Sequence, residues 1–180
     1  RCGRAKRSSR PIWLTRRRSL GLRSVGLTLH RFWLNLLLGL AAFAVIMVAA
    51  VVSGLLIQAF FPDLSREFEK NADMIMEAVP KVAPAFFFCV CLVIGYYEEL
   101  VFRGFLMTRL RRATGSWTVA VLGSSAVFVS LHLMDQAPAA LLAVGSLSLI
   151  FSLVTIWRRS LVPAILAHAL FDFTMFLNLY

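Results

Sequence analysis

Two adjacent glutamates and an arginine lie inside an otherwise apolar stretch of the chain, from Val82 to Met107. They form the pattern Glu-Glu-x-x-x-Arg, at Glu98, Glu99 and Arg103. A charged side chain at the centre of a bilayer costs roughly 2.5 to 3.5 kcal/mol on the insertion scale, so such residues usually face the protein interior and mark a functional site. We therefore expect chemistry that uses ionisable groups within the membrane.

Two further apolar segments carry ionisable residues at helical spacing. One holds the pattern Phe128-x-x-x-His132, and the other holds His168-x-x-x-Asp172. Residues four apart share one face of a helix, so His168 and Asp172 form a pair. Imidazole and carboxylate groups can hold or deprotonate a water molecule, which is the chemistry of a hydrolase.

The two glutamates are expected to have different roles. Glu99 can pair with Arg103, four residues further on, whereas Glu98 points roughly 100° away around the helix. Glu98 then has no cation of its own and is suited to act as a general base for water. We assign water activation to Glu98 and His132, and structural support to Glu99 with Arg103.

The candidate residues fall at similar depths in the membrane. Counted from the basic end of each helix at about 1.5 Å per residue, Glu98, His132, His168 and Asp172 lie between about 10 and about 22 Å deep. One water-filled site among three helices is therefore feasible. The competing interpretation is structural, because a membrane histidine often bridges helices and a buried ion pair can serve helix registry. The joint occurrence of these groups in one short chain favours a common site.

The composition excludes an ordinary soluble domain. Hydrophobic residues make up 59% of the 180 residues and charged residues 16%, against about 45–50% and about 25% in soluble proteins. A bilayer core needs about 20 apolar residues in helical form, so we predict an all-α, polytopic transmembrane bundle. The five predicted spans are 32–61, 82–108, 117–134, 136–157 and 161–179, and a short amphipathic helix is predicted at the interface within 63–81.

Positive charge is concentrated at the N-terminal end. Residues 1–31 hold ten of the nineteen Lys and Arg and no acid. We predict a basic cytosolic arm that is attracted to anionic lipid, by about 1 kcal/mol per basic residue. Nucleic acid is disfavoured as a partner, since only Trp13 could stack on a base there.

The remaining loops predict the orientation. The connections 109–116 and 158–159 are also basic, so the positive-inside rule puts the N-terminus in the cytosol. We expect an integral protein of a bacterial plasma membrane. An organellar membrane is the alternative, because an Arg-rich and Ser-rich arm without acids is also typical of a transit peptide.

One membrane domain is predicted over residues 32–180, with a motif-bearing core over 82–180, since no long linker divides the chain. The chain begins at Arg1 instead of Met, so we expect a further segment upstream. The three cysteines indicate neither a disulfide framework nor a cysteine-ligated zinc site.

Three segments resemble the motifs of a known family. They are Glu98-Glu99-Leu-Val-Phe-Arg103-Gly104, Phe128-Val-Ser-Leu-His132 and Pro163-Ala-Ile-Leu-Ala-His168-Ala-Leu-Phe-Asp172. In order and spacing they are similar to the motifs of the CAAX protease and bacteriocin-processing family (CPBP, or Abi) of intramembrane proteases. The resemblance covers about residues 82–180. It implies a helical membrane bundle and an endopeptidase that hydrolyses a peptide bond of a membrane-associated protein or peptide.

The resemblance also implies roles for single residues. Glu98 and His132 would activate the attacking water, while His168 and Asp172 would bind the developing oxyanion or complete the site. Prenyl-protein-processing members have Asn where this chain has Asp172. A carboxylate donates no hydrogen bond to an oxyanion unless it is protonated, which leaves a role as metal ligand or in orienting a histidine.

Metal dependence stays open at this point. Zn²⁺ could be held by Glu98, His132 and His168 with one position left for water; we favour the metal-free mechanism. The main rival function is a non-catalytic membrane scaffold or an immunity-type binding protein of the same fold. A small transporter that uses Glu98 and Asp172 is a third interpretation, disfavoured because the short chain has no inverted repeat.

Overall fold

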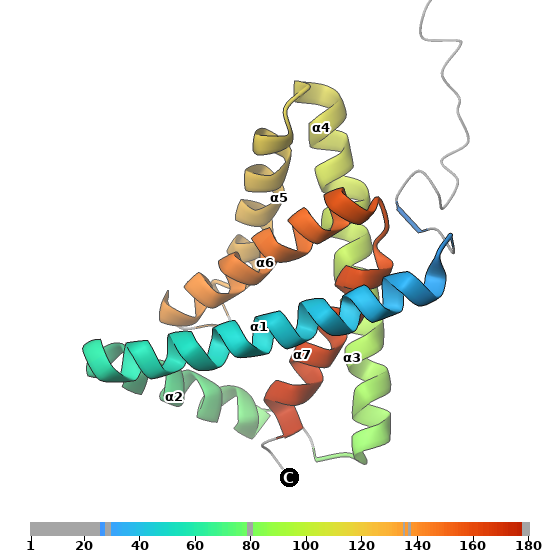
Figure 1. Ribbon diagram of the computed structural model, residues 1–180. Coiled ribbons are helices and arrows are strands. Elements are labelled where there is room, and N and C mark those ends of the chain that lie inside the picture. The colour runs from blue at the N-terminus through green and yellow to red at the C-terminus, as the bar shows by residue number, and fades with distance from the viewer. Residues whose placement is uncertain (1–25, 28–29, 79–80, 135, 137, 178–180) are drawn as a thin grey trace, which may run out of the picture.

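The computed structural model describes residues 26–27, 30–78, 81–134, 136 and 138–177. Every regular element in these ranges is a helix, which confirms the predicted all-α class (Figure 1). Most of the arm predicted over residues 1–31 lies outside them. The helices are α1 (Phe32–Phe60), α2 (Pro62–Ala78), α3 (Pro84–Glu99), the π-helix η3 (Leu100–Met107), α4 (Thr108–Thr114), α5 (Trp117–Leu131), α6 (Pro138–Arg158) and α7 (Val162–Leu177).

Several of these helices are long and apolar enough to cross a membrane. Within the described part of the chain they are three: Phe32–Phe60, Pro84–Thr114 and Ala140–Arg158. The predicted third and fifth spans form shorter apolar helices, Trp117–Leu131 and Val162–Met175. The chain is therefore an integral membrane protein with a helical bundle, and the number of crossings stays a prediction.

The helix that carries the glutamates changes its pitch directly after them. The segments α3, η3 and α4 form one continuous helix of 31 residues, in which residues 100–107 adopt the wider π-helical turn. Such π-helical turns are rare and are frequently found at functional sites. The hydroxyl of Ser124 donates to the carbonyl oxygen of Phe102 at 2.9 Å, so α5 supports the widened turn from outside. The sequence pattern contained no signal for this change.

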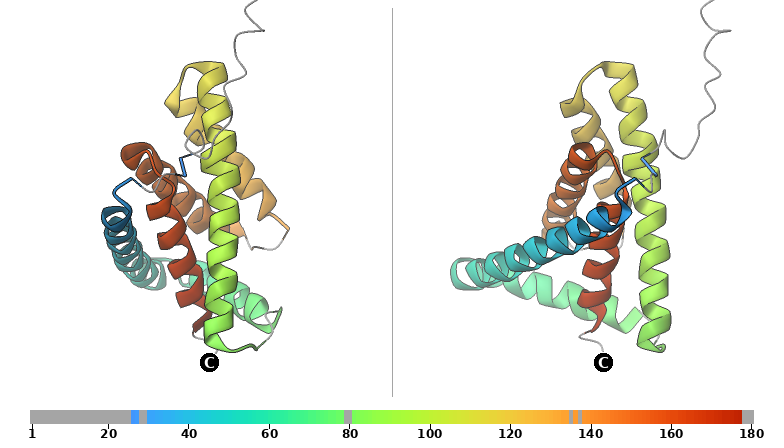
Figure 2. Two further views of the ribbon diagram at one scale, coloured as in Figure 1. Left: turned by 90° about the vertical axis from the view of Figure 1, so that its right-hand side faces the viewer. Right: turned by 45° about the vertical axis from the view of Figure 1, so that its right-hand side comes forward.

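Helix α7 lies between α1 and α3 at the centre of the molecule (Figures 1 and 2). On one side its Ala164 and Ala167 pack with Ile46 of α1. On the other side Ala169 packs with Phe87 and Cys91 of α3. Small side chains on α7 let both neighbours approach closely, as is usual between membrane helices.

The N-terminal end of α1 is held by polar contacts to the turn between α6 and α7. The side chain of Asn35 is buried; its amide donates to the hydroxyl of Ser160 at 3.4 Å, and its oxygen accepts from Nε of Arg158 at 3.2 Å. In Figure 1, α1 runs from this end at a steep angle to the α3–η3–α4 helix, and the left view of Figure 2 shows α7 between the two. These contacts fix how α1 crosses the centre of the bundle.

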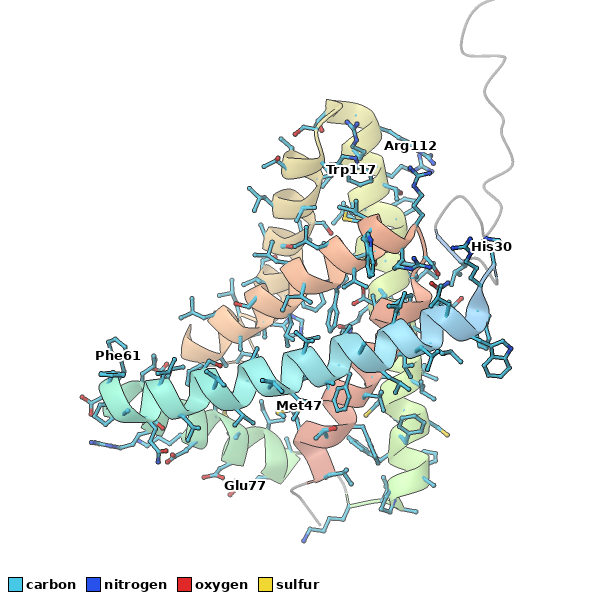
Figure 3. All side chains as sticks on the ribbon, viewed as in Figure 1. His30, Met47, Phe61, Glu77, Arg112 and Trp117 are labelled. Atoms are coloured by element: carbon cyan, nitrogen blue, oxygen red, sulfur yellow. The ribbon has the colours of Figure 1, made fainter. Side chains whose placement is uncertain are left out.

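The two ends of the molecule carry side chains of different charge. Arg112 and Trp117 lie at the α4–α5 end, whereas Glu77 lies on α2 towards the other end (Figure 3). Arg111 stacks on Trp117, with 5.2 Å from Cζ to the ring centroid. An arginine on an aromatic ring at a helix end is typical of a membrane interface. The cytosolic orientation of the N-terminus agrees with this distribution and stays a prediction.

The observed helix ends differ from the predicted bounds at several places; the helix of the second span, predicted over 82–108, runs from Pro84 to Thr114. The third span was expected to continue to Met134, but α5 ends at Leu131 and His132 lies in the following turn. Nδ1 of His132 lies 2.9 Å from the carbonyl oxygen of Phe128, so the ring caps the last helical turn. The amphipathic helix expected within 63–81 is α2, which begins one residue earlier, at Pro62.

A substitution at Gly95 tests how closely α3 packs against α7. A Cβ atom there would lie 3.2 Å from the backbone nitrogen of Ala169 and 3.3 Å from the carbonyl oxygen of Ile165. Gly95→Leu should therefore force the helices apart and lower the free energy of unfolding by about 1–3 kcal/mol or more. Thermal unfolding in detergent measures this.

Gly54 provides the matched control, because a Cβ atom on it would meet nothing within 4 Å. Gly54→Leu makes the same change on α1 and should leave the unfolding temperature close to that of the wild type. Equal losses in the two variants would contradict the proposed close packing.

Candidate active site

A buried ion pair joins the two ends of the first motif. Nη1 of Arg103 donates to Oε1 of Glu99 at 2.9 Å, and both side chains have no exposed area. The pairing expected from the sequence is thus present. Because water is excluded, each of these charges depends on the other and on the groups around them.

Two aromatic rings lie against the guanidinium of Arg103. Its Cζ is 4.7 Å from the ring centroid of Phe128 on α5 and 5.6 Å from that of Phe151 on α6. The electron-rich faces of such rings attract a cation, by about 2 kcal/mol when water is excluded. Arg103 therefore connects η3 with α5 and α6.

A group of serines completes the surroundings of Arg103. Nη2 of Arg103 donates to the carbonyl oxygen of Ser148 at 3.1 Å, and the hydroxyl of Ser148 donates to that of Ser125 at 2.9 Å. The hydroxyl of Ser152 donates to the same carbonyl of Ser148 at 2.8 Å. The bond between Ser148 and Ser125 joins α6 to α5, as small polar residues often do between membrane helices.

His168 lies between three carboxylates. Its Nδ1 is 2.9 Å from Oε1 of Glu99, the oxygen that also accepts from Arg103. Its Nε2 is 3.5 Å from Oε2 of Glu98 and 3.5 Å from Oδ2 of Asp172. An ionised Glu99 can only accept, so the proton of the neutral ring is on Nδ1.

The three carboxylates differ in how far they are exposed to solvent. Glu99 is fully buried, whereas the side chains of Glu98 and Asp172 are each 25% exposed. The imidazole of His168 lies between these environments and is itself buried. A proton or a substrate atom can therefore reach the Nε2 side of the ring, while Glu99 stays closed off on the Nδ1 side.

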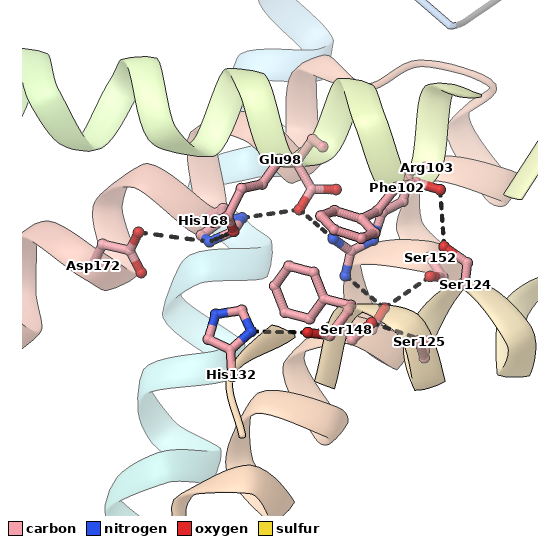
Figure 4. Close-up of polar contacts among 12 residues, drawn as sticks. Glu98, Phe102, Arg103, Ser124, Ser125, His132, Ser148, Ser152, His168 and Asp172 are labelled. Carbon is pink, nitrogen blue, oxygen red and sulfur yellow. Dashed lines mark hydrogen bonds and ion pairs between the residues drawn. The ribbon is translucent and has the colours of Figure 1, made fainter. Parts of the chain in front are cut away.

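His132 lines the same cavity as His168 and Asp172. This cavity has a volume of about 420 Å³, and its walls are largely apolar and aromatic. The close-up shows His132, His168 and Asp172 on one side, with Arg103 and the serines on the other (Figure 4). Glu98 does not line the cavity. Its carboxylate contacts His168, which does line it.

Helix α2 and the segment before α6 close one side of this cavity. Asn71 of α2 donates to the side-chain oxygen of Gln136 at 2.9 Å, and both residues line the cavity, as does Asp73. The sequence pattern of α2 predicted only an interfacial helix. Helix α2 lines the cavity together with Gln136 in the turn before α6. No local sequence pattern predicted this contact between the two segments.

The residues do not fit the zinc site that was considered for Glu98, His132 and His168. Among the described residues, no three His, Cys, Asp or Glu side chains form a group that could hold a metal ion. We therefore derive no step through a metal.

The three motifs thus converge on one region, and a comparison with protein-family models agrees with them. The family described as type II CAAX prenyl endopeptidase Rce1-like matches residues 80–174, which include all six predicted site residues. The chain belongs to this family. The CAAX protease resemblance is confirmed, and a CAAX-type intramembrane protease is the kind of function that the family supports. No curated protein and no solved structure matches the chain.

Two features of this family member's site escaped sequence reasoning. The contact of Glu99 with His168 joins residues 69 positions apart, so no local spacing could reveal it. Phe151 lies in an apolar run on α6, where nothing distinguishes it from its neighbours. Phe128, by contrast, was part of a recognised motif.

The buried pair allows a prediction about stability. Arg103→Met should leave the Glu99 carboxylate buried without its cation and should lower the free energy of unfolding by about 3–5 kcal/mol. The double variant Glu99→Gln with Arg103→Met removes both charges and should recover part of this loss. Unfolding of the purified variants in detergent provides the measurement. Additive losses would contradict direct coupling between the two side chains.

Proposed function

We propose that this protein is an intramembrane endopeptidase in which Glu98 and His132 activate a water molecule for attack on a peptide carbonyl. The observation that carries this proposal is the convergence of three helices on one site. His168 meets Glu98 and Asp172 through Nε2, at the edge of a cavity that His132 also lines. Family membership supports the same reaction class.

In the proposed reaction, Glu98 accepts a proton from water while the water oxygen bonds to the peptide carbon. The tetrahedral intermediate then collapses, the C–N bond breaks, and the proton passes to the leaving nitrogen. The products are a carboxylate and an amine. A positioned acid–base group of this kind contributes typically about 10²- to 10⁴-fold to the rate.

His168 is suited to stabilise the developing negative charge. As an imidazolium it donates from Nδ1 to Glu99 and carries a second proton on Nε2, which points towards Glu98, Asp172 and the cavity. That N–H can donate to an oxyanion, which an ionised Asp172 cannot do. We therefore assign Asp172 to orienting His168 and holding its charge, and not to direct donation.

The substrate is a membrane-associated protein or peptide. Eleven of the cavity-lining residues are apolar, whereas the polar ones are Asn71, Asp73, His132, Gln136, His168 and Asp172. An extended apolar chain suits such walls, and the polar groups would contact the peptide bond. The proposed setting is a bacterial plasma membrane, with the basic arm in the cytosol against anionic lipid.

The first functional prediction concerns the water-activating pair. Glu98→Gln and His132→Ala should each lower the cleavage rate by at least about 10²-fold while the protein still accumulates in membranes. Suitable substrates are paired farnesylated and unmodified peptides that end in a CAAX sequence, presented to the protein in liposomes. Mass spectrometry of the products locates the cleaved bond.

Glu77→Gln and His30→Ala are the matched controls, since both residues lie outside the site and should leave the rate unchanged. Full cleavage by the Glu98 and His132 variants would remove the proposed assignment. If the variants instead unfold more readily, while the protein that remains folded still binds a partner, the result would support the scaffold interpretation. The paired peptides separately report whether the lipid is required.

The second functional prediction concerns metal. Since the described residues form no metal-holding group, exhaustive dialysis against EDTA should leave the cleavage rate within about twofold of the untreated protein, because a catalytic ion would be worth far more. Loss of cleavage that added Zn²⁺ restores would contradict this and would require the histidines to rearrange around an ion.

A further inference from the structure

The orientation of His168 needs more than its hydrogen bond to Glu99. That contact, 2.9 Å long, fixes one ring nitrogen. A ring held at one edge can still tilt about that edge, which would move Nε2 away from Glu98 and Asp172. The two contacts of Nε2, at 3.5 Å each, are too long to prevent such a tilt alone.

A flat aromatic contact holds the face of the same ring. The ring of Phe151 stacks on the imidazole of His168, with centroids 5.0 Å apart and an angle of 16° between the planes. Phe128 approaches with its plane at 73° to the imidazole and a centroid distance of 6.4 Å. The imidazole therefore has a parallel ring as one neighbour and a nearly perpendicular ring as another. Tilting it would lose the stacked contact, which is worth about 0.5–1.5 kcal/mol.

Phe151 is itself rigidly held. Its side chain is 1% exposed and packs with Ile46, Ala164 and Ala167. The guanidinium of Arg103 lies 5.6 Å from its ring centroid and also binds the carbonyl of Ser148, one helical turn earlier. The buried ion pair thus sets the register of α6, and α6 in turn presents a flat ring to His168.

From this geometry we propose that Phe151 is a positioning residue that sets the plane of the His168 imidazole and so directs Nε2 towards Glu98 and Asp172. The effect of Phe151 on cleavage rests on the function proposed above. Its effect on the ring plane does not, because the ring contact exists in the folded protein without substrate.

The decisive experiment is NMR of the full chain in nanodiscs with labelled histidine. The sequence has three histidines, and His168→Gln assigns the signal of His168 by its loss. Protons that lie over an aromatic face are shifted upfield. Phe151→Leu should therefore move the His168 ring signals downfield, whereas Phe151→Tyr retains the ring and should retain most of the upfield shift.

Phe87→Leu is the matched control, since Phe87 is a buried phenylalanine that packs with Cys91 and Ala169 and has a ring contact with Phe173. It should leave the His168 signals in place. If Phe151→Leu does not fold, Phe151→Met keeps an apolar side chain of similar length without a ring. His168 signals that remain unchanged in a folded variant without the Phe151 ring would overturn the proposal.

Kinetics give a second readout that simple destabilisation would not reproduce. On a peptide that the wild type cleaves, Phe151→Leu should lower kcat by about 10-fold to 10²-fold, because a misplacement of about 1 Å can cost 10²-fold. KM should change much less than kcat, because Leu keeps the cavity wall at this position apolar, and Phe151→Tyr should restore most of kcat. An unchanged kcat would overturn the proposed positioning role, because the NMR shift reports the loss of the ring contact whatever plane the imidazole adopts. Absence of cleavage by the wild type would count against the proposed function and leave the ring contact seen by NMR standing.

Discussion

The arrangement of the site depends on one ionic interaction that is closed to water, between Glu99 and Arg103. The same carboxylate oxygen accepts from Arg103 and contacts His168, while the same guanidinium reaches the backbone of Ser148. One pair of opposite charges therefore connects η3, α6 and α7. A pair of this kind adds little net stability, but each partner is costly to leave alone, so the three helices are held in one relative position.

Close helix packing supplies the second constraint. Helix α7 carries His168 and Asp172, and its alanines allow α1 and α3 to approach it from two sides. Hydrophobic burial does not drive helices together inside lipid, so close contact and polar bonds must do so. Near the ion pair, the serines of α5 and α6 provide such bonds. The polar groups thus hold the bundle together as well as forming the site.

Local features of the fold were predictable because they arise from short sequence patterns. The apolar runs predicted the helices, and four-residue spacing predicted the contact between Glu99 and Arg103. Contacts between distant segments had no such signal. The link from Glu99 to His168 and the stacking of Phe151 depend on how α3, α6 and α7 meet. The end of α5 at Leu131 was also missed, because the apolar sequence continues to Met134 while the ring of His132 turns back to cap the helix.

The shortness of α5 affects how the surrounding lipid must behave. Its 15 residues span about 22 Å at 1.5 Å per residue, whereas the hydrocarbon layer is about 30 Å thick. A helix that is too short makes the bilayer locally thinner around it. If α5 crosses the bilayer as predicted, such thinning would draw the headgroup region inward beside His132, which begins the turn after the helix. Bulk solvent would then have a shorter path to the histidines than across a bilayer of full thickness.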